Sequence, residues 1–435
     1  MKDEWDMGEM TAVVEHALET SRGTATVVRV RRRQEGATRF SGSEITQNVA
    51  TSDATVDVEV AFDASVGAGS ANQLDAQSVV ACVRRAEAIA RVAPPDPEYM
   101  PPVEPAPIPE VETWHDATAA FSPIQRAEAI RRAIAIAQAE GMAGAGILAT
   151  RAEAMVVGNS AGHLAENQST QATVTFSATS PDSVGWAQGR THDVTALDVE
   201  AVARRAVDKA RAGHSPRDVE AGRYEVILEP AATAELLAFF FWYQMDAKAA
   251  DEGRTFLAGK KGSSIAAPKV TLFSDPTFAH APTCPFTDEG LPMRRVDWIR
   301  RGVLENLSYS RYWAARQGVA PTGRPRNMIL EGGPTSVEAM VRATKKGLLV
   351  TRFWYVRVVE PMRDLFTGMT RDGTFLIRDG EIVGPVRNLR FNESAVRLLR
   401  HVELLGEQEL VGEWDAAYIP YLKARDFSFT STTRF

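Results

Sequence analysis

The hydrophobic pattern between Glu229 and Gly253 predicts a buried helix. Pro230 suits the first helical position, where no partner is needed for an N–H group, and Gly253 can take the left-handed conformation that ends a helix. Residues 236–243 are apolar on every side, so a helix here has no polar face to turn toward water. The run is too short for a membrane span, which needs about 20 apolar residues. We expect a central helix over residues 231–252, covered by the rest of the chain.

Elsewhere the chain switches between helical spacing and the alternation typical of strands. Residues 56–62, VDVEVAF, alternate as a half-buried strand does, and Asp-Gly pairs at 372–373 and 379–380 are the strongest hairpin signals. Further helices are expected at Glu9–Ser21, Asp75–Val92, Pro123–Glu140, Leu197–Ala212, Ser310–Gln317, Thr335–Lys346 and Asn392–Leu404. Strands are expected at 24–33, 38–47, 55–62, 146–157, 164–179, 224–228, 270–273, 296–308 as a pair, 348–359, 365–369, 374–377 and 381–383.

This order of elements predicts an α+β fold with mostly antiparallel sheets, because strands follow one another directly and parallel βαβ order is not dominant. The pattern changes near residue 221, so we expect an N-terminal α+β domain over 1–220 and a C-terminal α+β domain over 221–435. Eight of the 23 prolines lie in the segment 94–109, which must be extended. Its apolar side chains favour a strap docked on the surface over a free linker.

Composition narrows the class of protein and its compartment. The chain has 435 residues, 44% of them hydrophobic, and a net charge of −7, which argues against a protein that mainly grips phosphate backbones. Cys82 and Cys284 form no disulfide framework or zinc-finger spacing, so a reducing cytoplasm is the simplest expectation. The N-terminal sequence MKDEWDMGEM has no apolar stretch of the kind found in signal peptides.

Local patterns offer few candidates for chemistry. No helix carries two histidines on one face, as zinc peptidases require, and no GxSxG motif occurs. The aromatic run 239–243 fits core packing better than a pocket. Arg311, Arg324 and Arg326 suit a bound carboxylate, although structural or solvated roles are commoner for such arginines. One group of potential metal ligands lies in a proline-interrupted loop, which favours a surface loop over a metal site: His280, Cys284, Asp288 and Glu289.

A series of motifs in the second half resembles the TldD/PmbA family, also called TldD/TldE. The series comprises FTDEGLPMRR (286–295), DWIRRGVLENL (297–307), YSRYWAARQG (309–318), PTGRPRN (321–327), the long run 366–394 and HVELLG (401–406). Weaker matches at 156–179 and 43–49 extend the resemblance to most of the chain. The candidate substrate-binding residues stand in these motifs: Asp288, Glu289, Arg311, Arg326 and Asn327.

The resemblance implies two α+β parts and a two-subunit assembly in which a TldD-like subunit is a zinc peptidase. That subunit carries HExxxH on the buried helix and a further cysteine ligand near its C-terminus. In this chain Ala238, Phe239 and Tyr243 occupy the place of the motif, and residues 407–435 contain no cysteine. Zinc needs about three protein ligands. We therefore expect no catalytic or metal-binding residue and no cofactor in this chain, with zinc only in a TldD-like partner.

The sequence thus predicts a cytoplasmic, TldE/PmbA-like subunit that helps to hold extended peptides for cleavage or precursor maturation. It would pair with a TldD-like zinc peptidase or with itself, and would bind neither nucleic acid nor membrane. Two alternatives remain open. One is an independent peptidase or amidase with a relocated site at residues 280–289, and the other is a homodimeric peptide-binding protein without catalysis.

Overall fold

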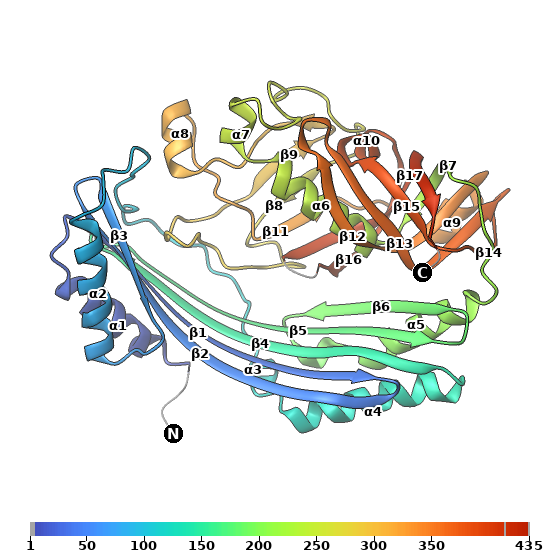
Figure 1. The fold of residues 1–435 in the computed structure, drawn as a ribbon, viewed down its shortest axis with the longest axis horizontal. Helices are drawn as coiled ribbons and strands as arrows, with labels where there is room; N and C mark the ends of the chain where they lie inside the picture. The colour runs from blue at the N-terminus through green and yellow to red at the C-terminus, as the bar shows by residue number, and fades with distance from the viewer. Residues whose placement is uncertain (1–4, 413–414, 434–435) are drawn as a thin grey trace.

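The computed structural model describes residues 5–412 and 415–433, whose strands form sheets of six and eleven strands. The six-stranded sheet is antiparallel throughout, with the order β3-β2-β1-β4-β5-β6, and it curves beneath the second half of the chain (Figure 1). Its strands are β1 (Ala25–Ser41), β2 (Glu44–Phe62), β3 (Ser65–Ala71), β4 (Ala143–Asn159), β5 (Leu164–Thr179) and β6 (Val184–Thr191).

Helices cover the convex face of this sheet, because its strands alternate between apolar and polar side chains. Val28 and Val30 of β1 face one pair of helices, and Val174 and Phe176 of β5 face the other. Asp75 caps the second helix by accepting a hydrogen bond from Ser78. The helices are α1 (Met7–Thr20), α2 (Ala76–Ala90), α3 (Asp116–Ala119), α4 (Pro123–Ala139) and α5 (Val199–Ala212), with a 3₁₀ turn at Val194–Ala196.

The first strands are longer than the sequence predicts. The expected runs 24–33, 38–47 and 55–62 are two strands joined at Gly42-Ser43, both in left-handed conformations. β3 pairs with β2 only from Val56 onward, so within the described residues the outer edge of β2 over 44–55 has no neighbouring strand. Polar residues fill this stretch and hide its strand character, because they do not alternate with apolar ones.

The eleven-stranded sheet is also mostly antiparallel, which confirms the predicted α+β class. Among the described strands, only two pairs run parallel: β11 with β17 and β12 with β7. Strand β17 pairs with β7 as well as with β15 and β16. Its strands are β7 (Gly222–Leu228), β8 (Leu272–Ser274), β9 (Val296–Arg300), β10 (Val303–Leu304), β11 (Asn327–Leu330), β12 (Lys346–Glu360), β13 (Leu365–Arg378), β14 (Glu381–Pro385), β15 (Leu389–Ser394), β16 (Val402–Val411) and β17 (Ala416–Thr432).

The expected helix over 231–252 is two helices. Helix α6 ends at Gln244, because the backbone at Met245 and Ala247 pairs with Ser308 instead of continuing the helix. Asp246 then caps a new short helix by accepting a hydrogen bond from the N–H of Ala249 at 2.6 Å. The helices of this half are α6 (Pro230–Gln244), α7 (Ala247–Asp251), α8 (Arg311–Gln317), α9 (Val337–Arg342) and α10 (Ala395–Arg400), with a 3₁₀ turn at Pro361–Arg363.

Two other expectations in this half are wrong. Asp372-Gly373 is no hairpin turn: it lies inside β13, where the register with β12 shifts, and forms a bulge. Asp379-Gly380 does form the predicted turn, between β13 and β14. The helix expected over 392–404 is a strand end, α10 and the start of β16, because Ser394 stops β15 and caps α10.

The proline-rich segment contacts both halves of the chain. The carbonyl of Val103 accepts a hydrogen bond from Asn159 at 2.8 Å, Arg311 donates to the carbonyl of Pro101, and Ile108 packs beside Phe286. Among the described residues no helix is long and apolar enough to cross a membrane.

Candidate functional site

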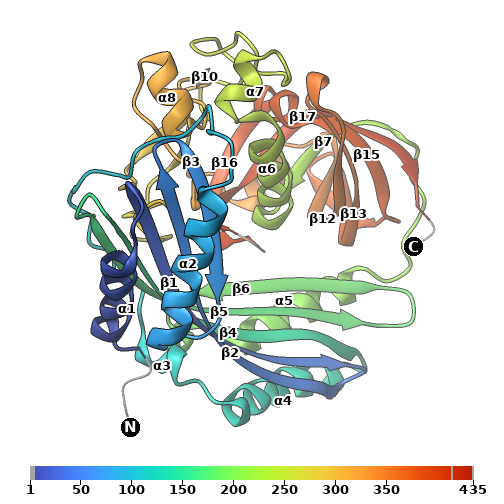
Figure 2. The ribbon, with the colours of Figure 1, turned by 60° about the vertical axis from the view of Figure 1, so that its left-hand side comes forward.

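A cavity of about 920 Å³ lies between the six-stranded sheet and α6. Figure 2 shows α6 above β5 and β6, on the side of the sheet opposite to α4. Alternate residues of β5 face the cavity with hydroxyl and amide groups, and the other set faces the helices below. The β5 residues that line the cavity floor with polar side chains are Gln171, Thr173, Thr175 and Ser177.

One face of α6 forms the roof of this cavity. Ala231, Glu235, Ala238 and Trp242 follow one another at helical spacing and all line it. The opposite face, which includes Phe240, is buried in the core. The expectation that the helix is covered all round is therefore wrong: Trp242 is 36% exposed and Tyr243 39% exposed.

The side chains at the positions of the expected zinc motif are poor zinc ligands. Ala238 lines the cavity and supplies no lone pair. Phe239 is buried, and its ring stacks on Tyr243 with centroids 6.3 Å apart. In the described residues no group of three or more His, Cys, Asp or Glu side chains is arranged to hold a metal ion. These donors do not fit the zinc that the resemblance implies for a TldD-like subunit.

Four arginines line the cavity, and they differ in their partners. Arg151 donates to Glu35 at 2.6 Å. Arg352 donates to Asp372 at 2.9 Å and lies over the ring of Trp186, 4.5 Å from its centroid. The other two, Arg190 and Arg324, form no ion pair within 4.0 Å in the described residues.

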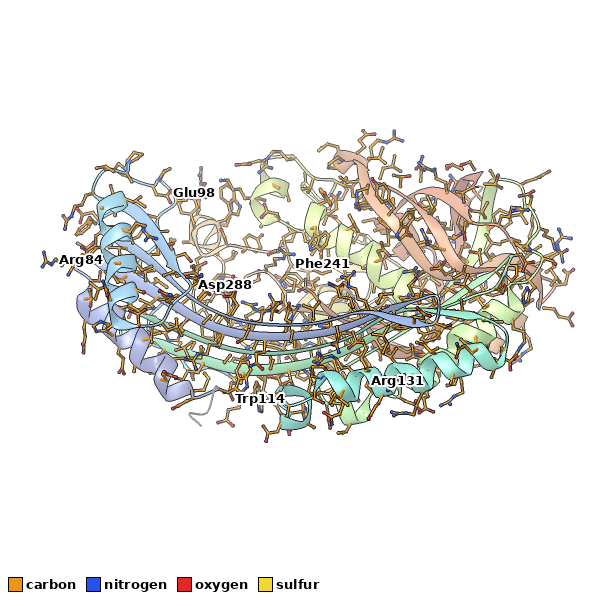
Figure 3. All side chains as sticks on the ribbon, turned by 60° about the horizontal axis from the view of Figure 1, so that its bottom comes forward. Arg84, Glu98, Trp114, Arg131, Phe241 and Asp288 are labelled. Carbon is orange, nitrogen blue, oxygen red and sulfur yellow. The ribbon has the colours of Figure 1, made fainter. Side chains whose placement is uncertain are left out.

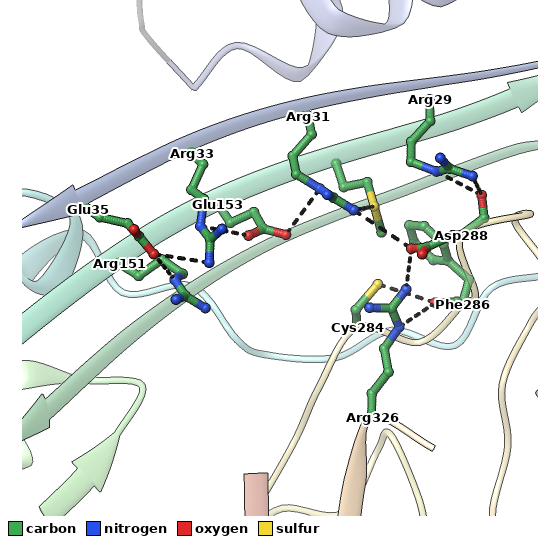
Figure 4. A network of polar contacts seen from close by, with 11 residues as sticks. Arg29, Arg31, Arg33, Glu35, Arg151, Glu153, Cys284, Phe286, Asp288 and Arg326 are labelled. Carbon is green, nitrogen blue, oxygen red and sulfur yellow. Dashed lines mark hydrogen bonds and ion pairs between the residues drawn. The ribbon is translucent and has the colours of Figure 1, made fainter. Parts of the chain in front are cut away.

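Asp288 and Arg326, both predicted site residues, pair with each other instead of lining the cavity. Arg326 donates to Asp288 at 2.8 Å, and Arg31 of β1 lies 3.7 Å from the same carboxylate (Figure 4). Burial opposes ionisation of Asp288, but Arg326, Arg29 and Arg31 together outweigh it and hold the pKa of Asp288 below its ordinary value. From here a ladder of alternating charges crosses the concave face of the sheet to the cavity: Arg31, Glu153, Arg33, Glu35 and Arg151.

Glu289 and Arg311 form a second pair, at 3.0 Å, in a separate cavity of about 760 Å³ beside the proline-rich segment. Asn327 is the one predicted substrate-binding residue that reaches the large cavity. Its side-chain amide is already used, because it donates to the carbonyls of Asp275 and Ala281, both at 2.7 Å. The structure therefore distributes the five predicted residues over three places.

Two histidines fix the loop that carries Asp288 against the sheet. His163 accepts a hydrogen bond from the N–H of Ala106, so its other ring nitrogen carries the proton and donates to the carbonyl of Gly290 at 2.7 Å. The ring of His192 lies 3.1 Å from the carbonyl of Pro282. These two hydrogen bonds thus hold the loop against the six-stranded sheet.

The four potential metal ligands of this loop, His280, Cys284, Asp288 and Glu289, do not converge on one point. His280 stacks on Tyr418 with centroids 5.1 Å apart, and the thiol of Cys284 contacts the carbonyl of Phe286. Asp288 and Glu289 pair with different arginines. Burial raises the pKa of the Cys284 thiol above its ordinary value, so it is not an activated thiolate.

Sequence reasoning missed the cavity residues of β6. Trp186, Gln188 and Arg190 line the cavity from this strand, which was not predicted. The alternation of Trp186, Gln188 and Arg190 is the signal that could have found it. The two glycines in VGWAQGRT obscure that signal, because glycine is uncommon inside strands.

Comparison with known proteins agrees with this architecture. Residues 221–431 match the family model of the PmbA/TldA metallopeptidase C-terminal domain. A metalloprotease of Methanothermobacter thermautotrophicus is 25% identical over 232 residues, 49% of this chain and 50% of the relative. One of Archaeoglobus fulgidus is 24% identical over 199 residues, 43% of this chain and 46% of the relative. The chain therefore matches only about half the length of these relatives.

Solved structures match over nearly the whole chain. TldE from Thermococcus kodakarensis has a TM-score of 0.88 at 21% identity, covering 97% of this chain and 100% of that one. A putative modulator of a DNA gyrase from Thermotoga maritima has a TM-score of 0.85 at 18% identity, covering 97% and 99%. At these identities the likeness establishes the fold. Fold and C-terminal domain together define a metallopeptidase-related α+β protein, and the chain belongs to the TldD/PmbA/TldE family.

Proposed function

We propose that this chain is the non-metal, TldE-like subunit of a heteromeric TldD/TldE-type metalloprotease, and that its cavity helps to hold extended peptides for cleavage or maturation. The observation that carries the proposal is the roof of the cavity. One face of α6 borders the cavity, but Ala238, Phe239 and Tyr243 supply neither a set of zinc ligands nor a general base. The zinc would be held by the partner.

The cavity suits a peptide because it combines polar and aromatic walls. The hydroxyl and amide side chains of β5 can bond peptide groups, while Trp242 and Phe241, the latter labelled in Figure 3, offer apolar surface. Addition of a peptide strand to the free edge of β6 is less favourable. The carbonyls of Trp186 and Gln188 on that edge already accept hydrogen bonds from Lys209 and Arg205. We therefore propose binding by side chains of the floor rather than by strand addition.

The proposal is tested by co-expression with a TldD-like relative that carries HExxxH. The complex is purified through a tag on this chain alone, and hydrolysis of an extended peptide is measured for each chain and for the pair. We expect no hydrolysis by this chain, hydrolysis by the pair, and loss of activity when a chelator removes zinc. Sustained hydrolysis by this chain without a partner would refute the assignment.

A cavity variant separates chamber formation from subunit pairing. Ala238→Trp places a large ring into the cavity without entering the core, because Ala238 faces the open space. We expect the complex to form normally and to cleave the peptide more slowly. Unchanged cleavage would remove this cavity from the proposal. We propose the cytoplasm as the compartment, since Cys82 and Cys284 are both free thiols.

A further inference from the structure

The arginines of the large cavity fall into two classes. Arg151 and Arg352 are neutralised by Glu35 and Asp372, as described above. Arg190 and Arg324 are not. For Arg190 the lack of an ion pair is costly, because burial removes its charge from water and no carboxylate compensates it. Arg324 is exposed and keeps its hydration, so Arg190 is the residue that needs an explanation.

Arg190 is held in place by neutral groups from both halves of the chain. It donates to the carbonyl of Gly412 at 2.9 Å and to the side-chain oxygen of Gln171 at 3.0 Å. A guanidinium has five N–H donors, so three remain for other acceptors. Burial lowers the pKa of Arg190 to about 10, which still leaves the side chain charged at neutral pH. The result is a positioned cation with spare donors at the cavity wall.

Arg324 lies on the exposed side of the same cavity, in the segment that leads into β11. It forms no hydrogen bond or ion pair with the described residues. Asp415 lines the same cavity as Arg190 and Arg324. The cavity is also lined by Glu235 and Asp246, so its arginines share it with three carboxylates.

We propose that Arg190 and Arg324 bind a carboxylate of the peptide held in the cavity. This subunit would then bind peptides that carry a free carboxylate more tightly than neutral ones. The proposal rests on the peptide-binding function given above and adds a substrate class to it. Two planar guanidinium groups suit a carboxylate because each can offer paired N–H donors to its two oxygens. The carboxylate is either the C-terminus of the peptide or an acidic side chain, which the experiment distinguishes.

The test measures binding of three fluorescent peptides of one neutral sequence by anisotropy, with the full chain alone and in its complex. The first peptide has a free C-terminus, the second is amidated, and the third is amidated with one internal Glu. We expect the free acid or the Glu peptide to bind about tenfold more tightly than the neutral amide. Whichever of the two gains affinity identifies the source of the carboxylate.

The double variant R190Q/R324Q should abolish this preference, measured as the ratio of the affinities for the acidic and the neutral peptides. Arg324→Gln alone should weaken it several-fold, and this exposed change is not expected to disturb folding. Arg131→Gln is the matched control, since Arg131 is an exposed arginine of α4 beyond the far face of the sheet (Figure 3). It should behave as the wild type.

The outcomes separate the two proposals. Equal binding of all three peptides, or a preference that survives in Arg324→Gln and in the double variant, overturns the carboxylate site and leaves peptide binding intact. Failure of the wild-type complex to bind any of the peptides rejects the proposed function itself, together with the carboxylate site.

Discussion

The two faces of the six-stranded sheet use arginine differently. On the convex face, Arg126 of α4 is 2% exposed and donates to four oxygens, from Thr38, Asn48, Phe121 and Thr150. On the concave face, Arg190 has two such acceptors and borders a cavity. Neither arginine has an ion-pair partner within the described residues. The number of neutral acceptors thus distinguishes an arginine that completes a core from one that has donors left for a ligand.

The strongest test of this comparison removes Arg126. Arg126→Ala should lower the free energy of unfolding by about 4 kcal/mol, because it leaves buried oxygens without a donor and opens a void. Urea denaturation measures the change. Arg190→Gln should cost less than about 1 kcal/mol, because only two acceptors lose a donor and its other donors face the cavity. Arg131→Ala on the same helix as Arg126 serves as the control, and equal losses at positions 126 and 190 would contradict the distinction.

A buried carboxyl in the C-terminal half extends the comparison to negative charge. Asp364 is fully buried: one oxygen accepts from Ser394 and Val396, and the other has no partner in the described residues. Burial raises its pKa from 3.8 to about 7, and neighbouring Glu393 adds to the shift. Because the folded-state pKa is the higher one, the stability that Asp364 contributes is complete below pH about 4 and is lost as the pH rises through about 7.

The free energy of unfolding should therefore fall between pH 4 and pH 8, by about 4 kcal/mol for this group. Asp364→Asn stays neutral and should remove that part of the slope, which urea denaturation at several pH values measures. Asp218→Asn at an exposed position is the control. Parallel pH profiles for wild type and Asp364→Asn would show that Asp364 does not titrate in this range.

A smaller loss of stability is expected from a substitution at Gly36, which lies against the guanidinium of Arg126. A side chain at Gly36 of β1 would place its Cβ 2.4 Å from the guanidinium of Arg126, which its four acceptors hold in place. Gly36→Ala should therefore destabilise the chain by about 2 kcal/mol, even though alanine suits a strand better than glycine. The double variant Gly36→Ala with Arg126→Ala should lose less than the sum of the two. Strict additivity would mean that the two residues do not compete for space.

The smallest effect belongs to the charge ladder on the concave face. Arg33 lies 3.0 Å from Glu35 and 3.6 Å from Glu153, but these side chains are partly exposed to water. Arg33→Gln should cost about 0.5 kcal/mol and less in 1 M salt, because exposed ion pairs are weak and screened. Thermal unfolding at two salt concentrations measures this. A loss as large as that for Arg126→Ala would show that these ion pairs behave as buried charges rather than as exposed ones.

Local signals predicted the parts of the fold that are determined locally. Asp75 and Pro230 correctly begin helices, and Asp379-Gly380 correctly turns a hairpin, because caps and turns depend on a few neighbouring residues. Asp372-Gly373 carries the same dipeptide but lies inside a strand, where β12 pairs across it. The break after Gln244 likewise depends on Ser308, which lies far along the chain.

The candidate site shows the same limit. From the sequence, Arg311, Arg324 and Arg326 were candidates for binding a carboxylate. The structure neutralises the first and the third through Glu289 and Asp288, and turns only Arg324 toward the cavity. Arg190 could not be found beside it from sequence, because its position depends on Gly412 and on a strand that was not predicted. Partners remote in sequence decide which arginine stays available.

The outer edge of β2 over residues 44–55 has a consequence for the protein in solution. An unpaired strand edge offers a row of N–H and C=O groups to any other chain, and is a common starting point for aggregation. Here the residues along it are Thr46, Gln47, Asn48, Ser52, Asp53 and others of similar polarity, exposed on both sides. They give a second chain little apolar surface to bury, since Val49 is the one large hydrophobic residue that is exposed along this described stretch. The molecule thus tolerates a long open edge because a second chain that paired with it would bury few apolar side chains.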